Sequence, residues 1–179
     1  AVLERLAWMP FTLKNRVRLL INGKATFDAI LAAIDAANEY ILVQFFIVKD
    51  DELGQELKAR LLARCRAGVR VHFIYDEMGS HKLSRAYVHE LREAGVEMRP
   101  FHSNRRNRFQ LNFRNHRKIV IADGQVGLVG GLNVGDEYTH NWRDLAVAIR
   151  GPAVDQLQEV FVDDWYFASG EDITNKRYF

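Results

Sequence analysis

His116-Arg117-Lys118-Ile119-Val120-Ile121-Ala122-Asp123, with Gly130-Gly131-Leu132-Asn133 after it, decides the fold expected of this chain. The apolar run 119–122 predicts a buried strand, the Asp123-Gly124 pair predicts a tight turn, and residues 126–129 predict the partner strand. The stretch therefore indicates a strand-turn-strand unit inside a sheet.

The polar residues of this unit indicate a site for a phosphodiester. Side chains alternate faces along a strand, so His116 and Lys118 point to one side and deliver an imidazole and an ammonium group together. Gly130 and Gly131 leave the backbone unshielded, so an anion could approach the main-chain amides, and Asn133 adds a side-chain amide. A nucleophile and several phosphate-binding donors are thus expected around one point.

The His-x-Lys tripeptide alone is also compatible with an ordinary surface hairpin. The longer pattern, His-x-Lys-x(4)-Asp followed by Gly-Gly-x-Asn, is similar to the signature of the phospholipase D superfamily. Over about 17–165 the chain resembles the N-terminal catalytic half of the bacterial cardiolipin synthases. The resemblance rests on the phrases Arg114-Asn115-His116-Arg117-Lys118-Ile119-Val120, Gly130-Gly131-Leu132-Asn133-Val134-Gly135-Asp136-Glu137-Tyr138, Trp142-Arg143-Asp144, Gly151-Pro152-Ala153-Val154, Asp163-Asp164-Trp165 and Tyr75-Asp76-Glu77-Met78-Gly79-Ser80.

Helical and strand patterns alternate along the chain, which predicts an α/β fold. Strands are expected at 17–21, 41–48, 69–75, 96–101, 119–122, 126–129 and 144–149, and helices around 27–34, 53–62, 80–94 and 152–166. The resemblance implies a mixed, largely parallel central sheet flanked by helices on both faces. At 179 residues and 48% apolar content, a single domain is expected over 1–179, with an extension at 1–16, a core at 17–167 and a tail at 168–179.

The resemblance implies a two-step displacement. His116 would attack phosphorus and form a phospho-histidine intermediate, while Lys118 and Asn133, with Gly130 and Gly131, would bind the non-bridging oxygens. No metal or other cofactor is expected, because the chain has one cysteine and no His-acid grouping with ligand spacing.

Three carboxylates are candidates near this chemistry. Asp144 is expected to hold the second imidazole nitrogen of His116, as the equivalent acid does in the superfamily; a surface acid at a strand start is the alternative. Asp123 belongs to the motif, but its place at a turn favours capping of backbone amides over direct chemistry. Asp76, at a strand end, is a further candidate for the pocket.

The sequence holds only one His-Lys motif, whereas superfamily sites use two, the second histidine serving as general acid. Either a second half of the polypeptide supplies it, or two identical chains meet about a twofold axis. The N-terminal-half phrases and the absence of an initiator Met before Ala1 favour the first. The resemblance also implies attachment to the bacterial cell membrane through segments absent from this chain, leaving this fragment soluble or peripheral.

Charge is distributed unevenly, although the net charge is only +2. Residues 99–122 contain no Asp or Glu but seven cations: Arg99, Arg105, Arg106, Arg108, Arg114, Arg117 and Lys118. The Arg105 to Arg108 stretch is either a solvated loop or a contact for anions. The leading hypothesis is cardiolipin synthesis from phosphatidylglycerol or a related phosphatidyl donor at a membrane surface. A homodimeric single-motif nuclease or phosphodiesterase and a catalytically incomplete fragment that binds anionic lipid are the alternatives, and nucleic acid is the less favoured partner.

Overall fold

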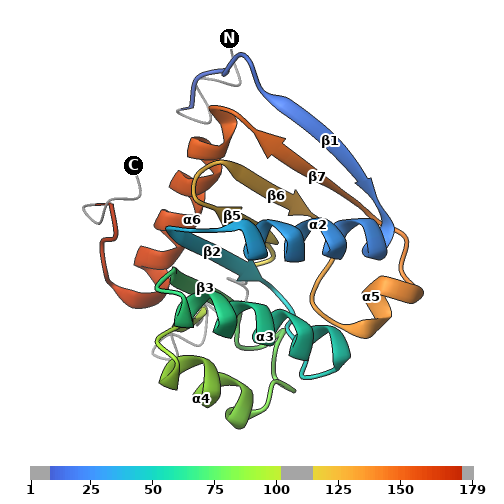
Figure 1. The fold of residues 1–179 in the computed structure, drawn as a ribbon, viewed down its shortest axis with the longest axis vertical. Helices are drawn as coiled ribbons and strands as arrows, with labels where there is room; N and C mark the ends of the chain where they lie inside the picture. The colour runs from blue at the N-terminus through green and yellow to red at the C-terminus, as the bar shows by residue number, and fades with distance from the viewer. Residues whose placement is uncertain (1–8, 102–114, 175–179) are drawn as a thin grey trace, which may run out of the picture.

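A computed structural model describes residues 9–101 and 115–174 of the chain. The fold is α/β, as predicted, and is built on one seven-stranded sheet (Figure 1). The strands are β1 (Arg16–Ile21), β2 (Tyr40–Phe45), β3 (Arg70–Asp76), β4 (Glu97–Phe101), β5 (Ile119–Ala122), β6 (Val126–Gly130) and β7 (Leu145–Arg150). The helices are α2 (Asn22–Ala36), α3 (Glu52–Arg66), α4 (Arg85–Glu93), α5 (Asp136–His140) and α6 (Ala153–Ser169).

The strand order is β1-β7-β6-β5-β2-β3-β4, and the sheet is mixed. Only the β2–β3 and β3–β4 pairs are parallel. The β1–β7, β7–β6, β6–β5 and β5–β2 pairs are antiparallel. The expectation of a largely parallel sheet is therefore wrong. Tight connections such as the turn between β5 and β6 reverse the chain and impose antiparallel pairing, and β1 pairs with β7 rather than with the strand that follows it in sequence.

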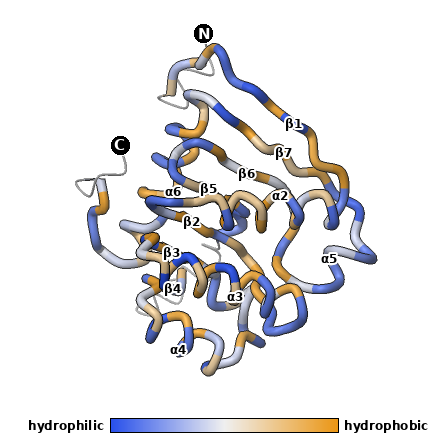
Figure 2. Tube along the Cα trace, in the orientation of Figure 1, coloured by the Kyte–Doolittle hydropathy of each residue, from blue (hydrophilic) through white to orange (hydrophobic). Residues whose placement is uncertain are grey.

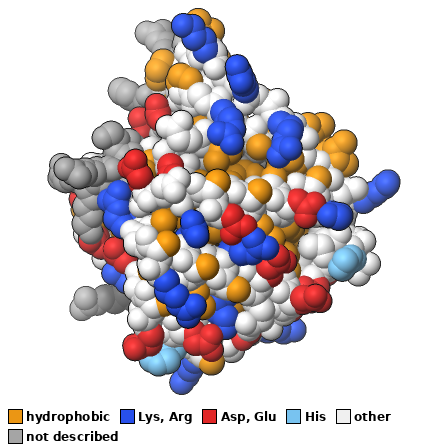
Figure 3. All heavy atoms as spheres, in the orientation of Figure 1, with side chains coloured by type: hydrophobic (Ala, Val, Ile, Leu, Met, Phe, Trp, Pro, Cys, Tyr) orange, Lys and Arg blue, Asp and Glu red, His pale blue; other side chains and the backbone are white. Residues whose placement is uncertain are grey.

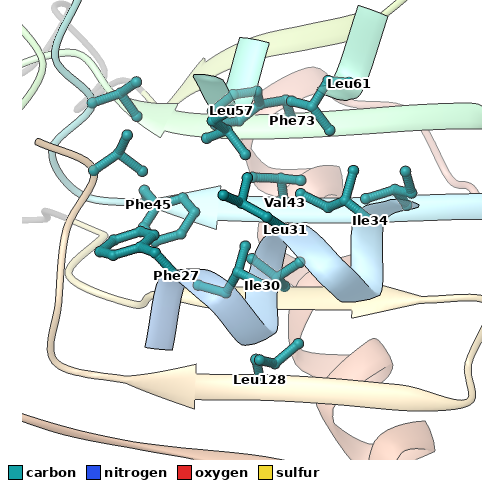
Figure 4. Close-up of a cluster of buried hydrophobic side chains, with 14 of the residues drawn as sticks. Phe27, Ile30, Leu31, Ile34, Val43, Phe45, Leu57, Leu61, Phe73 and Leu128 are labelled. Carbon is teal, nitrogen blue, oxygen red and sulfur yellow. The ribbon is translucent and has the colours of Figure 1, made fainter. Parts of the chain in front are cut away.

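Helices cover both faces of the sheet, as expected (Figure 1). One core cluster joins α2, α3 and α4 to their face, with Ile30, Val43 and Leu57 among its members (Figure 4). A second cluster joins α6 to the opposite face through Phe161 and Trp165. The central strand β2 is buried on both faces, which its continuous apolar sequence predicted.

Two local assignments differ from the sequence-based expectation. Helix α4 begins at Arg85, not near Ser80, because the side chain of Ser84 accepts the Tyr87 amide as the helix N-cap. The Ser80 hydroxyl instead bridges the end of β2, donating to the Phe46 carbonyl and accepting the Val48 amide. The five-residue helix α5 was not predicted, since so short a helix carries no apolar periodicity.

No helix in the described ranges is long and apolar enough to cross a membrane. The basic stretch from Arg105 to Arg108 lies outside the described residues.

Candidate active site

His116 and Lys118 meet at the start of β5, at the end of the sheet nearest α5 (Figure 1). The Lys118 ammonium lies 2.9 Å from His116 Nδ1 and donates to the His116 carbonyl at 2.6 Å. The Phe46 ring packs against both residues, 4.7 Å from the imidazole centroid and 5.4 Å from the ammonium nitrogen. His116 is exposed, whereas Lys118 is buried. The accessible imidazole of His116 thus contacts the buried ammonium group of Lys118, and both lie against the Phe46 ring.

Burial lowers the pKa of both groups, and the Lys118 charge lowers that of His116 further. The pKa of Lys118 falls from 10.5 to about 8, because burial disfavours its charge; the nearby Asp144 carboxylate acts in the opposite direction. The pKa of His116 is lowered by burial and then by the Lys118 charge, against an opposing effect of Asp76. The imidazole is therefore neutral near pH 7, the protonation state that a nucleophile requires.

Asp144 lies beside Lys118 and the glycine pair. A Cβ atom added at Gly131 would stand 2.2 Å from Asp144 Oδ2, so glycine lets this carboxylate lie directly against the backbone. Among the described residues, the His116 ring forms its hydrogen bond with Lys118 and none with Asp144. The role of Asp144 as the group that orients the imidazole stays a prediction.

The other proposed phosphate donors already have protein partners. The amides of Gly130 and Gly131 point to the carbonyls of Lys118 and Leu145, at 3.4 Å each. The buried Asn133 accepts the Ile47 amide at 3.0 Å, and its amide nitrogen lies 3.4 Å from the Tyr138 hydroxyl, a long contact. Gly130 bonds to Lys118 and Gly131 lies against Asp144, whereas Asn133 contacts Ile47 and Tyr138; the binding of phosphate by these residues stays a prediction.

Asp76 contributes more to this region than the sequence indicated. Its buried carboxylate accepts the amides of Met78 and Gly79 through Oδ1 and the amide of Asn115 through Oδ2, at 2.8 to 3.2 Å. Asn115 in turn accepts the Arg117 amide at 3.1 Å. The end of β3 is thereby connected to the residue that precedes His116. The only sequence signal was an acid at a strand end.

Arg117 points to the opposite face of the sheet, as the alternation predicted. Its guanidinium donates to both oxygens of Asp164 on α6, at 2.7 and 2.6 Å, and Gln44 of β2 donates to the same carboxylate. Such charge-assisted hydrogen bonds are the stronger ones in proteins. These bonds hold the backbone of the motif from the α6 face of the sheet, which is opposite to the face that carries His116 and Lys118.

Asp123 lies at the other end of β5. Its carboxylate accepts hydrogen bonds from the amides of Asn38, Glu39 and Tyr40, at 2.8 to 2.9 Å, in the connection between α2 and β2. We therefore assign it a structural role rather than a place among the groups at His116. No group of three or more His, Cys, Asp or Glu side chains in the described part of the chain could hold a metal ion.

The family model described as "Cardiolipin synthase, PLD-like domain" matches residues 30–165, which include all of these groups. The chain belongs to this phospholipase D-like family. Cardiolipin synthase A of Pseudomonas aeruginosa LESB58 is 53% identical over 175 residues, which cover 93% of this chain and 36% of that protein. The enzyme of the same name from Pseudomonas fluorescens is 49% identical over 177 residues, with 94% and 37% covered. The chain thus spans little more than a third of these relatives.

Solved structures share the fold at low sequence identity. Nuc from Salmonella typhimurium, described as a phospholipase D family member, aligns with a TM-score of 0.69 at 20% identity and covers 87% of this chain and 97% of its own. Phosphatidylserine synthase from Haemophilus influenzae aligns with a TM-score of 0.66 at 16% identity, covering 89% and 39%. These likenesses establish the phospholipase D-like fold.

Proposed function

We propose that this chain supplies the nucleophilic half of a phosphatidyltransferase that makes cardiolipin. The observation that carries the proposal is the contact between the neutral, exposed His116 and the buried Lys118 in a chain of this family. Similarity to cardiolipin synthase A over nearly the whole chain supports a phosphatidyl donor such as phosphatidylglycerol.

The transfer would proceed in two displacements. A nitrogen of His116 attacks phosphorus, a P–N bond forms, the P–O bond to glycerol breaks, and the glycerol oxygen takes a proton from a general acid. A hydroxyl of a second phosphatidylglycerol then attacks phosphorus, releases the imidazole and gives up its proton to the same group. The chain has one His-Lys motif, so the general acid must come from a second phospholipase D-like half.

The imidazole must change partners before it attacks. In the structure Lys118 donates to Nδ1, which places the imidazole proton on Nε2. Attack through Nε2 requires that proton on Nδ1 and an acceptor facing it. We propose that bound phosphate draws Lys118 away and that Asp144, already beside Lys118, then accepts from Nδ1.

The proposal is tested with the protein and vesicles of phosphatidylglycerol, alone and with a separately produced second half of a relative. Mass spectrometry should detect cardiolipin, glycerol and a His116 peptide carrying a phosphatidyl group, all lost in His116→Ala. His89→Ala is the matched control, because His89 is an exposed histidine on α4. Cleavage of plasmid DNA that requires His116, without lipid turnover, would replace the lipid assignment with a nuclease. Lipid binding without any covalent intermediate would reduce the chain to a binding fragment.

A further inference from the structure

The edge strand β1 exposes a row of large apolar side chains. Val17, Leu19 and Ile21 are 63%, 55% and 58% exposed, and Leu145 on the neighbouring β7 is 54% exposed. The register pairs Ile21 directly with Leu145, so these side chains lie on one face of the sheet. We call these four residues the β1 stripe. Contiguous exposed apolar residues of this kind mark interaction surfaces.

Helix α6 leaves the stripe open. The helix packs mainly against β4 to β7, and its cluster includes Ile149 of β7 but no residue of β1. Figure 1 shows β1 beyond the helix, at the outer edge of the sheet. The apolar side chains of β1 on this face thus have no layer of described residues over them.

The same edge is cationic. The exposed residues Lys14, Arg16, Arg18 and Arg150 form no ion pair with any described residue, and residues 9–27 contain no Asp or Glu. Figure 3 shows Lys and Arg side chains over β1 and β7, and Figure 2 shows β1 changing from hydrophilic to hydrophobic along its length. The three arginines line a groove of about 660 Å³ between β1 and α2.

We propose that the β1 edge docks this domain onto the surface of an anionic bilayer. Because both faces of an edge strand border solvent, a bilayer laid against β1 meets apolar side chains from one face and arginines from the other. The stripe enters the headgroup region while the arginines bind lipid phosphates. A second copy of this chain fits this edge poorly, since a twofold contact would bring two sets of the same cations together.

Docking here would place the candidate site at the lipid surface. The end of β1 reaches the site, because the Asn22 amide donates to the Asp144 carbonyl at 2.9 Å and Asp144 immediately precedes Leu145 of the stripe. A phosphatidyl headgroup could then reach His116 without its acyl chains leaving the membrane. This benefit rests on the proposed function, whereas docking can be measured without turnover.

Cosedimentation of the protein with vesicles, at low and at physiological salt, tests the proposal. We expect binding to phosphatidylglycerol-phosphatidylcholine vesicles and at least tenfold weaker binding to phosphatidylcholine alone. Leu19→Thr with Ile21→Thr, and separately Arg16→Gln with Arg18→Gln, should each weaken binding about tenfold. Tyr166→Gln, an exposed aromatic residue on α6, and Lys82→Gln with Arg85→Gln, exposed cations elsewhere, should leave it unchanged. Circular dichroism melting curves check that each variant folds.

Several results would overturn the proposal. These are absent binding at low salt, equal binding of the stripe variants and wild type, or a dimer in sedimentation velocity that Leu19→Thr with Ile21→Thr dissociates. Stripe-dependent binding without cardiolipin formation would leave docking intact and reject the proposed function. Turnover of detergent-dispersed lipid by a protein that does not bind vesicles would support the proposed function and reject docking.

Discussion

The two ends of β5 each carry a charged side chain, but the two charges differ in how well the protein compensates them. At one end Asp123 is surrounded by three backbone amides that all donate to it. At the other end Lys118 is buried beside His116, and the pKa of each group is lowered. A strand of four buried residues separates a carboxylate that accepts three amides from a cation to which no described carboxylate is bonded. The carboxylate stabilises the fold, whereas the cation is held where a substrate anion can complete its interactions.

Substitution of Lys118 should have the largest effect on activity and should show that the two ends of β5 differ in role. We expect Lys118→Met to lower phosphatidyl transfer, in the assembly with a second half, by about 10²- to 10³-fold, because developing charge on phosphate loses its buried cation. The free energy of unfolding should not fall, since a desolvated charge disappears with the side chain. Kinetic assays and urea denaturation measure the two effects. A variant that loses stability but keeps its activity would place Lys118 in the same class as Asp123.

The pH dependence of stability should distinguish the ends without any substrate. The pKa of folded Lys118 is about 8 and its ordinary value is 10.5, so the unfolded chain binds more protons between these values. Stability should therefore rise from pH 8 to 10, by at most about 3 kcal/mol. Urea titrations of wild type and Lys118→Met across this range isolate the effect. Identical pH profiles would show that the charge of Lys118 is not disfavoured by folding.

Asp123→Ala tests the end of β5 where the carboxylate accepts three backbone amides. Three amides lose a charged acceptor, and we expect the free energy of unfolding to fall by about 2 kcal/mol, with Asp123→Asn intermediate. Transfer measured well below the melting temperature should remain close to that of wild type. If activity instead falls a hundredfold in a folded protein, Asp123 acts in the chemistry and the contrast fails.

Asp76→Asn should have the smallest effect, because its amide oxygen can still accept from the Met78 and Gly79 amides and only the Asn115 amide loses its acceptor. The pKa of His116 should fall further, since Asp76 is the carboxylate that raises it. We expect about a tenfold loss of turnover with a shift of its acidic limb to lower pH, and little change in KM. NMR titration of the His116 ring checks the pKa. An unshifted resonance would limit Asp76 to holding the backbone.

Local patterns predicted much of this molecule. The alternation of His116, Arg117 and Lys118 follows from a period of two, the β5-turn-β6 unit from turn residues, and the buried strand β2 from a run of apolar residues. These features involve residues close in sequence, where backbone geometry alone limits the outcome.

Features that depend on distant partners were less accessible. The contact between Asp76 and Asn115 spans 39 residues, and the pairing of β1 with β7 cannot be derived from either strand alone. The amides of Gly130 and Gly131 were expected to face an anion, yet their direction is set by β5 and β7. The sequence predicted that Asp144 lies near the site. It did not show that the carboxylate lies against Gly131 and acts on Lys118.

The β1–β7 pairing also has a kinetic consequence. The two strands are about 130 residues apart in the sequence, so β1 cannot pair until the chain as far as β7 is available. Closing so long a loop carries a large entropic cost, and sheets that depend on such contacts fold slowly. Until β7 has been synthesised, β1 remains without its partner strand, and its apolar residues are open to misassociation.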